Sequence, residues 1–418
     1  MKNLRIIDTR LWAIAIAALG VRLLYMFVIA KAPVGVGGDA GFYQSAASQI
    51  AHGHFYYRVI FGHAYKTAEH PPLYPLVLSV GSLLGGDSLQ AHRILSCVIG
   101  AFAVLLIGYL ARTLGGPRAG VVAAAIAALY PPFVTADALV MSEPLFTLTV
   151  AAALLVAIRL RRRPTLLGTV ALGVTIGLAA LTRAEGLLLI PLLGWPASQP
   201  RVRGGGWRLI LITAAAAVAI VPWTVRNAVV FHRLLFAADA NTLVAGANCH
   251  DTYYGHDIGW WSLDCLAHGR TLAQLHVGDA SAGPALDYAG DHVGRLALVI
   301  PVRVLRAFDL FQPLRQGNRE LRRKWVDVVG LVFYFPLLVL AVIGLLRVGA
   351  LRAAGARWVL LAPVLMVVIA SALGWGIGRF RIGADVSIVV LAAMLLARPR
   401  ELMVWSARRA RVLHQYRG

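Results

Sequence analysis

The sequence predicts an all-α polytopic membrane protein with about ten transmembrane helices. Two observations support this fold class. Of the 418 residues, 59% are hydrophobic and only 14% are charged, which is far from the composition of a soluble globular domain. Long apolar runs also recur along the whole chain, most of them flanked by arginine, proline or glycine. One such run would be a membrane anchor, whereas this many predict a helical bundle.

The expected helices follow the order of these runs within a single transmembrane domain, residues 1–418. The first run, residues 11–30, is too long for the hydrophobic region of a cleaved signal peptide and is interrupted by Arg22, so we interpret it as a membrane helix. The other helices are expected at residues 90–111, 119–136, 144–160, 165–182, 184–197, 208–226, 327–346, 358–375 and 384–398.

The basic residues between the helices assign the two faces of the bundle. If the N-terminus is cytoplasmic, the cytoplasmic segments carry about half of the 40 Lys and Arg residues but only Asp8 and Glu401 of the acidic ones. This positive-inside pattern explains the net charge of +21 without nucleic acid, which we exclude as a partner. We therefore expect a bacterial inner-membrane protein whose chemistry lies on the periplasmic side.

Two periplasmic loops are too long to be simple connections. Residues 31–89 contain two helical stretches, 39–52 and 71–84, that are expected to lie along the membrane interface. Residues 227–325 end in a basic, apolar stretch, from Arg295 to Lys324, that would bind the headgroups of membrane lipids. For its last cluster, Arg319, Arg322, Arg323 and Lys324, ordinary solvated charge is equally compatible with the sequence. Long loops in compact proteins are commonly functional, so we expect the substrate-binding groups in these two segments.

Two cysteines enclose a Trp-, Tyr- and Gly-rich stretch of the second loop. Cys249 and Cys265 could form a disulfide outside the cytoplasm, which would stabilise the loop by about 3 kcal/mol. Two unpaired thiols are the alternative.

A first candidate for catalysis lies just beyond the first helix. Asp39 follows Gly37 and Gly38 and precedes Tyr43 by four positions. A carboxylate here could accept a proton from an acceptor hydroxyl, and the glycines leave room around it. The alternative is a helix N-cap.

A second candidate is the run from Glu69 through His70, Pro71 and Pro72 to Tyr74. Prolines at a helix start leave the N–H groups and the positive end of the helix dipole open to a bound phosphate. Glu69 and His70 at that opening could contact the phosphate or hold a divalent metal. A polar anchor at the membrane interface is the alternative for His70.

A third carboxylate, Glu143, stands between Ser142 and Pro144 at the periplasmic mouth of the helix expected at residues 144–160. A carboxylate buried near a membrane surface needs a partner or a function. The sequence equally allows an N-cap before a proline at the first helical position.

Arginines recur on the same face, and arginine suits phosphate because its donors form a planar fork. For any single arginine, snorkelling or pairing with a neighbouring carboxylate is the alternative. The arginines in question are Arg183, Arg226, Arg379 and Arg381.

Taken in order, these motifs resemble the protein-mannosyltransferase-like branch of the GT-C glycosyltransferase superfamily, which includes the aminoarabinose transferases acting on lipid A. The resemblance runs over nearly the whole chain. It is carried by Asp39, His70-Pro71-Pro72-Leu73-Tyr74, Ser142-Glu143, Thr182-Arg183-Ala184-Glu185-Gly186, Pro222-Trp223-Thr224-Val225-Arg226-Asn227 and Arg379-Phe380-Arg381.

The resemblance implies the GT-C fold and an inverting hexosyl or pentosyl transfer from a polyprenyl-phosphate donor to a hydroxyl of a lipid, a cell-wall glycan or a protein. It implies Asp39 as general base and Glu143 as the second catalytic carboxylate. The remaining implied residues are His70, Arg183 and Arg381 for the donor phosphate, Tyr43, Tyr74, Arg226 and Asn248 for substrate, and Glu69 with His70 for a divalent metal.

A transporter or flippase of lipid-linked or small polar substrates is the main alternative, because polar groups in a helical bundle also mark substrate paths. The sequence lacks repeated halves and a matched pair of interrupted helices, which are typical of secondary transporters. We therefore favour the enzyme.

Overall fold

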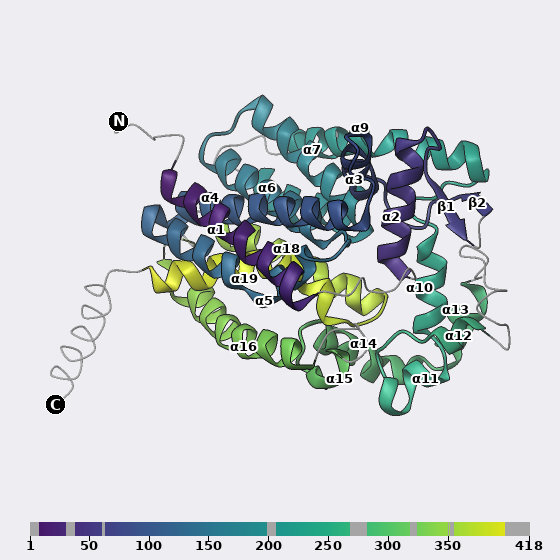
Figure 1. The fold of residues 1–418 in the computed structure, drawn as a ribbon. Helices are drawn as coiled ribbons and strands as arrows, with labels where there is room; N and C mark the ends of the chain where they lie inside the picture. Colours follow the sequence, from purple (N-terminus) through teal and green to yellow (C-terminus); the bar gives the residue numbers. More distant parts are fainter. Residues whose placement is uncertain are drawn as a thin grey trace, which may run out of the picture.

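The computed structural model of this chain describes residues 8–30, 38–60, 63–198, 206–267, 282–317, 324–349, 351 and 355–397. Within these residues the chain forms a bundle of helices with a two-stranded sheet at one end (Figure 1). Gly37, Arg319, Arg322 and Arg323, which belong to motifs discussed above, lie outside the described residues.

Each apolar segment that was expected to be a helix is helical over most of its length. The segments expected at residues 90–111 and 119–136 are two helices, because the helical backbone of α4 is interrupted at Gly116, whose φ is 84°, just before Pro117. The last residues of the second segment belong to α5. The bundle helices are α1 (Thr9–Leu24, continued by the π-helix η1, Tyr25–Ile29), α4 (Leu89–Leu129), α5 (Pro131–Asp137), α6 (Glu143–Arg162), α7 (Leu166–Thr182), α8 (Leu189–Ser198), α9 (Gly206–Phe231), α16 (Lys324–Arg347), α18 (Ala356–Leu373) and α19 (Ile382–Leu396).

Six helices of the described part are long and apolar enough to cross a membrane: α1 with η1, α4, α6, α9, α16 and α18. Three of them, α1, α9 and α16, bury only 22% of their most apolar 18 residues. Their apolar side chains therefore face outward, as expected in contact with lipid. The protein is therefore a multi-pass membrane protein, as predicted. The number of ten spans stays a prediction, because α7, α8 and α19 have only 17, 10 and 15 residues.

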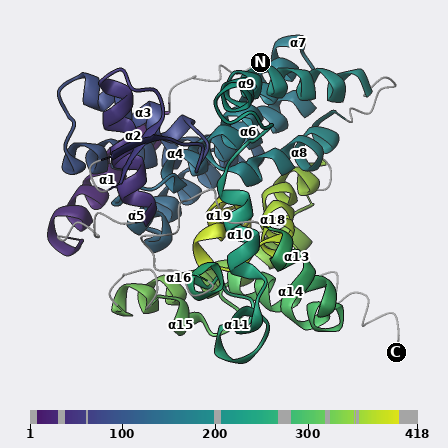
Figure 2. The ribbon, with the colours of Figure 1, turned by 90° about the vertical axis from the view of Figure 1, so that its right-hand side faces the viewer.

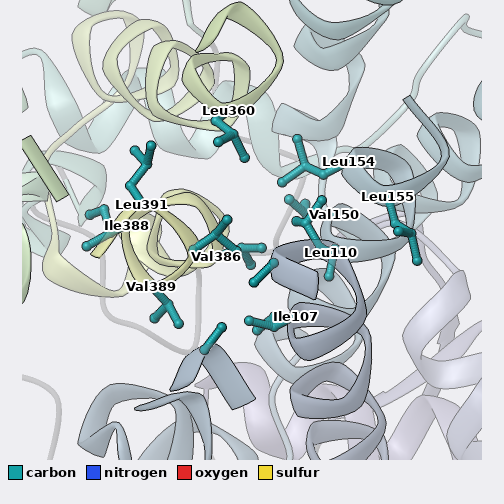
Figure 3. Packing of buried hydrophobic residues seen from close by; sticks show 14 of the residues in the cluster. Ile107, Leu110, Val150, Leu154, Leu155, Leu360, Val386, Ile388, Val389 and Leu391 are labelled. Atoms are coloured by element: carbon teal, nitrogen blue, oxygen red, sulfur yellow. The ribbon is translucent and has the colours of Figure 1, made fainter. Parts of the chain in front are cut away.

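The largest hydrophobic core surrounds α19, which is buried from Ile382 to Met394. Figure 3 shows Val386 and Val389 of this helix among side chains of α4, α6 and α18, such as Ile107 and Val150. A helix that is apolar on all sides fits this central position. It fixes the place of the short segment that precedes it.

One ion pair is buried inside the bundle. Arg22 of α1 is 0% exposed, and its Nε donates to Asp137 Oδ2 at 2.6 Å. Its Nη1 also donates to the backbone oxygens of Ala18 and Ala128. A buried charge needs such partners, and these explain how an arginine is accommodated within the first membrane helix.

Both long loops lie at one end of the bundle, which we call the loop end; α1 begins and α19 ends at the opposite end (Figure 1). Figure 2 looks onto the loop end, with α2 and α3 on one side and α11, α14 and α15 on another. The first loop contains α2 (Gly38–Ala51), the antiparallel strands β1 (Tyr57–Ile60) and β2 (His63–Lys66), and α3 (Leu73–Leu83). The second contains α10 (Asp239–Ala247), α11 (His250–Tyr253), η3 (Gly255–Asp257), α12 (Leu263–Ala267), α13 (Gly283–Asp291), α14 (Val293–Ala307) and α15 (Pro313–Gly317).

Two arginines of the basic stretch in the second loop are used differently from the lipid contact that we expected. Arg303 and Arg306 of α14 are each 2% exposed. Arg303 Nη2 donates to the Ala247 carbonyl at 2.6 Å, and Arg306 Nε donates to the Ile258 carbonyl at 2.7 Å. These two arginines therefore hold the second loop together, because buried guanidinium groups need acceptors and the loop carbonyls supply them.

Candidate active site

Asp39 lies in the first turn of α2, at the loop end. The helix begins at Gly38, whose φ of 74° lies in the left-handed region that favours glycine. Asp39 Oδ2 lies 2.5 Å from Arg379 Nη2, and Oδ1 lies 3.6 Å from His70 Nε2. The carboxylate that the sequence suggested as a general base therefore faces two basic side chains.

His70 and Glu69 immediately precede the turn that opens α3. The His70 ring packs edge-on against Phe42 with centroids 4.9 Å apart, and its Nε2 lies 4.0 Å from Glu69 Oε1. The other oxygen of Glu69 pairs with Arg58 of β1. The Tyr56 hydroxyl donates to the His70 carbonyl at 2.7 Å, which fixes the backbone at this point.

Glu143 is the first residue of α6 and is 2% exposed. Its Oε1 accepts a hydrogen bond from Arg183 Nη1 at 2.9 Å and lies 3.7 Å from Arg379 Nε. Its Oε2 is buried and has no hydrogen-bond partner within the described part of the chain. A buried carboxylate oxygen without a donor is unfavourable, so this oxygen is a ready acceptor for a substrate hydroxyl.

Arg183 follows α7 and lies between two carboxylates. Its Nε donates to Glu185 Oε1 at 2.6 Å, in addition to the bond with Glu143. The guanidinium also lies over the rings of Phe146 and Phe380, at 5.9 Å and 5.4 Å from their centroids. These contacts hold the Arg183 guanidinium in a fixed orientation beside Glu143.

Arg379 joins the two catalytic candidates, because it contacts Asp39 and lies beside Glu143. It belongs to η5 (Gly378–Arg381), the short 3₁₀ turn between α18 and α19. The sequence singled out the motif that contains Arg379 and Arg381, but we chose Arg381 for the donor phosphate. Residues two apart on a 3₁₀ turn point in different directions, and only the structure shows which of them faces Asp39.

Five side chains from separate segments thus meet at the loop end, and we call them the site cluster: Asp39, His70, Glu143, Arg183 and Arg379.

The charges of the site cluster shift the pKa values of Asp39 and of the neighbouring Tyr43. Burial alone would raise the pKa of the Asp39 carboxyl, but the Arg379 guanidinium and the His70 ring hold this pKa well below its usual range. Burial and the nearby Asp39 carboxylate raise the pKa of Tyr43 well above its ordinary value. At neutral pH Asp39 is therefore ionised, whereas Tyr43 is a neutral hydrogen-bond donor.

Comparison with known proteins connects this geometry to a family. The model of the dolichyl-phosphate-mannose-protein mannosyltransferase family matches residues 69–225, which include His70, Glu143 and Arg183. No curated protein sequence matches the chain.

Two solved structures share the fold over nearly the whole chain, and a third is a weaker match. The oligosaccharyltransferase AglB of Archaeoglobus fulgidus, in complex with an inhibitory peptide and a dolichol-phosphate, is 17% identical with a TM-score of 0.55, over 96% of this chain and 51% of that one. The apo form of the Archaeoglobus fulgidus oligosaccharyltransferase is 18% identical with a TM-score of 0.55, over 97% of this chain and 52% of that one. ArnT from Cupriavidus metallidurans bound to undecaprenyl phosphate is 16% identical with a TM-score of 0.46, over 93% of this chain and 78% of that one.

The chain has the GT-C fold, as the resemblance drawn from the ordered motifs implied. The family model matches less than half of the chain, residues 69–225. The chain spans about half the length of the archaeal oligosaccharyltransferases that it matches.

The two predicted substrate tyrosines pack beside the site cluster. The Tyr43 ring lies 5.2 Å from the His70 ring and 5.0 Å from the Tyr74 ring. Tyr74 is fully buried, and its hydroxyl forms a 2.6 Å hydrogen bond with Ser96 Oγ. Tyr43 is thus adjacent to the carboxylates, while Tyr74 supports it from behind.

Arg226 of α9 anchors the first loop. Its Nη1 donates to the Thr67 carbonyl at 2.7 Å, and its Nη2 donates to the Tyr56 carbonyl at 3.3 Å. The guanidinium also lies over the Trp223 ring, 5.3 Å from the centroid. The structure thus gives Arg226 a supporting role near the site, and its contact with substrate stays a prediction.

Two other predicted contacts lie apart from the site cluster. Arg381 is 3% exposed and pairs with Asp309 at 2.6 Å and Asp385 at 2.9 Å. Asn248 is 7% exposed, and its Oδ1 accepts hydrogen bonds from the Tyr253 hydroxyl and Arg303 Nη2. Both side chains have their polar groups engaged with protein partners, and their contacts with donor or substrate stay predictions.

The two cysteines of the second loop are joined. Cys249 and Cys265 form a disulfide with their Cα atoms 6.0 Å apart. With Asp251, they form the one group of three or more close metal-ligating side chains found in the described residues. Because a metal binds the thiolate, the disulfide takes both sulfur atoms out of such a site.

Proposed function

We propose that this chain is a glycosyltransferase that moves a sugar from a polyprenyl-phosphate donor to an acceptor hydroxyl, with inversion and with Asp39 as general base. The observation that carries this proposal is the site cluster, in which two carboxylates and two arginines meet at the loop end of a membrane bundle. A phosphate-linked sugar needs cations for its phosphate and a base for its acceptor.

The chemistry follows from these groups. Asp39 takes the proton of the acceptor hydroxyl while the acceptor oxygen bonds to the anomeric carbon. The bond between that carbon and the phosphate oxygen breaks, and its electron pair stays on that oxygen. Polyprenyl phosphate therefore leaves with one more negative charge than the donor phosphate carried. Attack from the face opposite the leaving phosphate inverts the anomeric configuration.

The leaving phosphate gains charge, so the site must supply cations that substrate can reach. The Arg379 side chain is 25% exposed, compared with 11% for Arg183 and 4% for Arg381. Arg379 is therefore the best placed of the three to bind the phosphate, and His70 lies on the other side of Asp39. We assign Arg379 as the principal phosphate ligand, with Arg183 and His70 as its neighbours.

The acceptor hydroxyl needs a second contact besides the base. Glu143 Oε2 is the buried oxygen without a donor, and the neutral Tyr43 hydroxyl faces the same cluster. We assign Glu143 to orient the acceptor, and the classes of acceptor we propose are a lipid, a glycan or a protein. Hexosyl and pentosyl donors are both compatible with these contacts.

A divalent metal is a secondary part of the proposal. His70 Nε2 and Glu69 Oε1 lie 4.0 Å apart, and a carboxylate with an imidazole suits a divalent cation. The Arg58 guanidinium beside Glu69 already neutralises part of that site. His70 and Glu69 would hold the metal, which would supply additional positive charge for the donor phosphate.

The charge pattern supports a bacterial inner membrane, with the site on the periplasmic face. The last turn of α6, at the end opposite Glu143, contains Arg159, Arg161 and Arg162. Such clusters favour the cytoplasmic side. The disulfide between Cys249 and Cys265 at the loop end supports an oxidising compartment for that end.

Reconstitution tests this function. Purified chain in liposomes is given a panel of polyprenyl-phosphate hexoses and pentoses together with lipid, glycan and peptide acceptors that carry free hydroxyls. It should release polyprenyl phosphate and form a glycoside of inverted configuration on an acceptor, detectable by mass spectrometry and NMR. A transporter or flippase would instead move the intact lipid-linked sugar without breaking its glycosyl bond. Movement without bond cleavage for every donor would reject the enzyme.

A further inference from the structure

We propose that Asp39 and the donor phosphate compete for Arg379, so that binding of the donor releases the general base. This inference rests on the proposed function. Without donor, the Arg379 guanidinium is bonded to Asp39 through Nη2. With donor, the same cation would turn to the phosphate and leave the carboxylate for the acceptor proton.

The competition follows from the contacts of Asp39. It faces Arg379 from η5, His70 from the segment before α3 and Tyr43 on its own helix. Tyr43 is neutral, and the 3.6 Å separation from His70 is too long for a direct hydrogen bond. Arg379 therefore makes the shortest charged contact of this carboxylate among the described residues. An aspartate whose oxygen is held by a guanidinium is a poor proton acceptor.

Arg379 is able to change partners. Its side chain and that of Asp39 are 25% and 27% exposed, so the pair borders an open part of the site. The long, flexible arginine side chain allows the guanidinium to move while the backbone stays in place. Glu143 Oε1 lies 3.7 Å from Arg379 Nε. This carboxylate would keep the guanidinium in the site after its contact with Asp39 is broken.

The second loop fixes the backbone on which Arg379 turns. The Gly376 amide donates to the Gly259 carbonyl at 3.0 Å. A Cβ at Gly376 would come within 2.0 Å of the Arg303 carbonyl oxygen, so this approach requires glycine. The Trp375 ring also packs on the Phe380 ring, with centroids 5.0 Å apart, which further holds the turn in place. The side chain of Arg379 is thus the moving part of a rigid turn.

The consequence is an order of events. The donor binds first, because its phosphate must take Arg379 before Asp39 can accept a proton. Asp39 in turn weakens donor binding, because the phosphate must displace a bonded carboxylate. Asp39 and the donor phosphate bind the same guanidinium, and such coupling is reciprocal. The effect of Asp39 on Arg379 is therefore measurable as a change in donor affinity.

Binding of undecaprenyl phosphate, the probe, to the full chain in nanodiscs tests the inference without turnover. Asp39→Asn should bind the probe about tenfold more tightly than wild type, because the competing charge is gone. Arg379→Gln should weaken binding by about tenfold. In the double variant, the gain from Asp39→Asn should fall below about threefold, which is the signature of coupling through Arg379.

Three comparisons complete the test. Asp251→Asn removes an equal charge from an exposed position of the second loop and should leave the affinity unchanged. The melting temperature of Arg379→Gln shows whether this variant folds. If it does not fold, Arg379→Lys replaces it, and because lysine keeps the charge, its affinity for the probe should lie between those of wild type and a variant without the charge. An unchanged affinity in Asp39→Asn, or an equal gain with and without Arg379, would overturn the competition. Absence of saturable binding by wild type would overturn the lipid-phosphate donor as well.

Discussion

Arg379 and Arg381 are two residues apart on one 3₁₀ turn, yet they pair with different carboxylates. Arg379 Nη2 lies 2.5 Å from Asp39 Oδ2 at the partly open site, whereas Arg381 Nη1 lies 2.6 Å from Asp309 Oδ2 in a closed network with Asp385. The turn thus separates a cation available to substrate from a cation that fixes the fold. This division of roles gives a direct test by substitution.

Arg381→Gln should lower the stability of the protein by about 3–5 kcal/mol, because it leaves the buried Asp385 carboxylate, 1% exposed, without its cation. Arg379→Gln, the matched control two positions earlier, removes a partly exposed pair and should cost about 0–1 kcal/mol. Thermal unfolding of both variants in detergent measures the difference. Equal destabilisation by the two would contradict the assignment.

Asp39→Asn should fold normally and lose transfer activity by a factor of about 10²–10⁴, which is the range for removal of a general base. The variant keeps the size of the side chain, so the loss reports the missing proton acceptor. Turnover of donor in proteoliposomes measures it, and wild-type melting temperature serves as the check of folding. Near-normal turnover would exclude Asp39 as the base.

Gly376→Ala should reduce turnover more than it reduces stability, because its Cβ would meet the Arg303 carbonyl oxygen and displace the turn that carries Arg379. Gly290→Ala, in α13 of the second loop, adds a Cβ into open space and serves as the control. Parallel assays of turnover and melting temperature separate the two effects. A fully active Gly376→Ala protein would show that the turn tolerates this shift.

The disulfide should stabilise the second loop by about 3 kcal/mol, the value expected for a loop of its length. The double substitution Cys249→Ser and Cys265→Ser should therefore lower the melting temperature of the protein. Hydrogen exchange should become faster in α10 and α11 and stay unchanged in α19, which lies in the bundle core. Labelling by a maleimide before reduction would show instead that the thiols are unpaired.

The depressed pKa of Asp39 determines how its contribution to stability varies with pH. A carboxyl whose pKa is lowered in the folded state stabilises that state fully above the unfolded pKa, about 3.9. This contribution is lost as the pH falls through the folded pKa. The melting-temperature difference between wild type and Asp39→Asn should stay constant from about pH 7 to pH 5 and shrink below about pH 4. A difference that shrinks between pH 7 and pH 5 would show that the pKa is not depressed.

The sequence by itself determined the class of fold, since apolar runs of membrane length can satisfy their backbone groups only as helices. It also identified Asp39, His70, Glu143 and Arg183, because each stands at the end of an apolar run and was found in an ordered motif. The use of Arg303 within the second loop was not foreseen. It depends on packing between segments far apart in the chain.

The tertiary structure alone decided which arginine faces Asp39. Arg379 and Arg381 share one motif, and their identical chemistry gives the sequence no means of distinguishing them. The direction of each side chain is set by the burial of α19 and by the close approach of Gly376 to the second loop. Periodic apolar patterns encode which residues are buried, whereas the partner of a charged side chain depends on distances that arise only when the segments pack together.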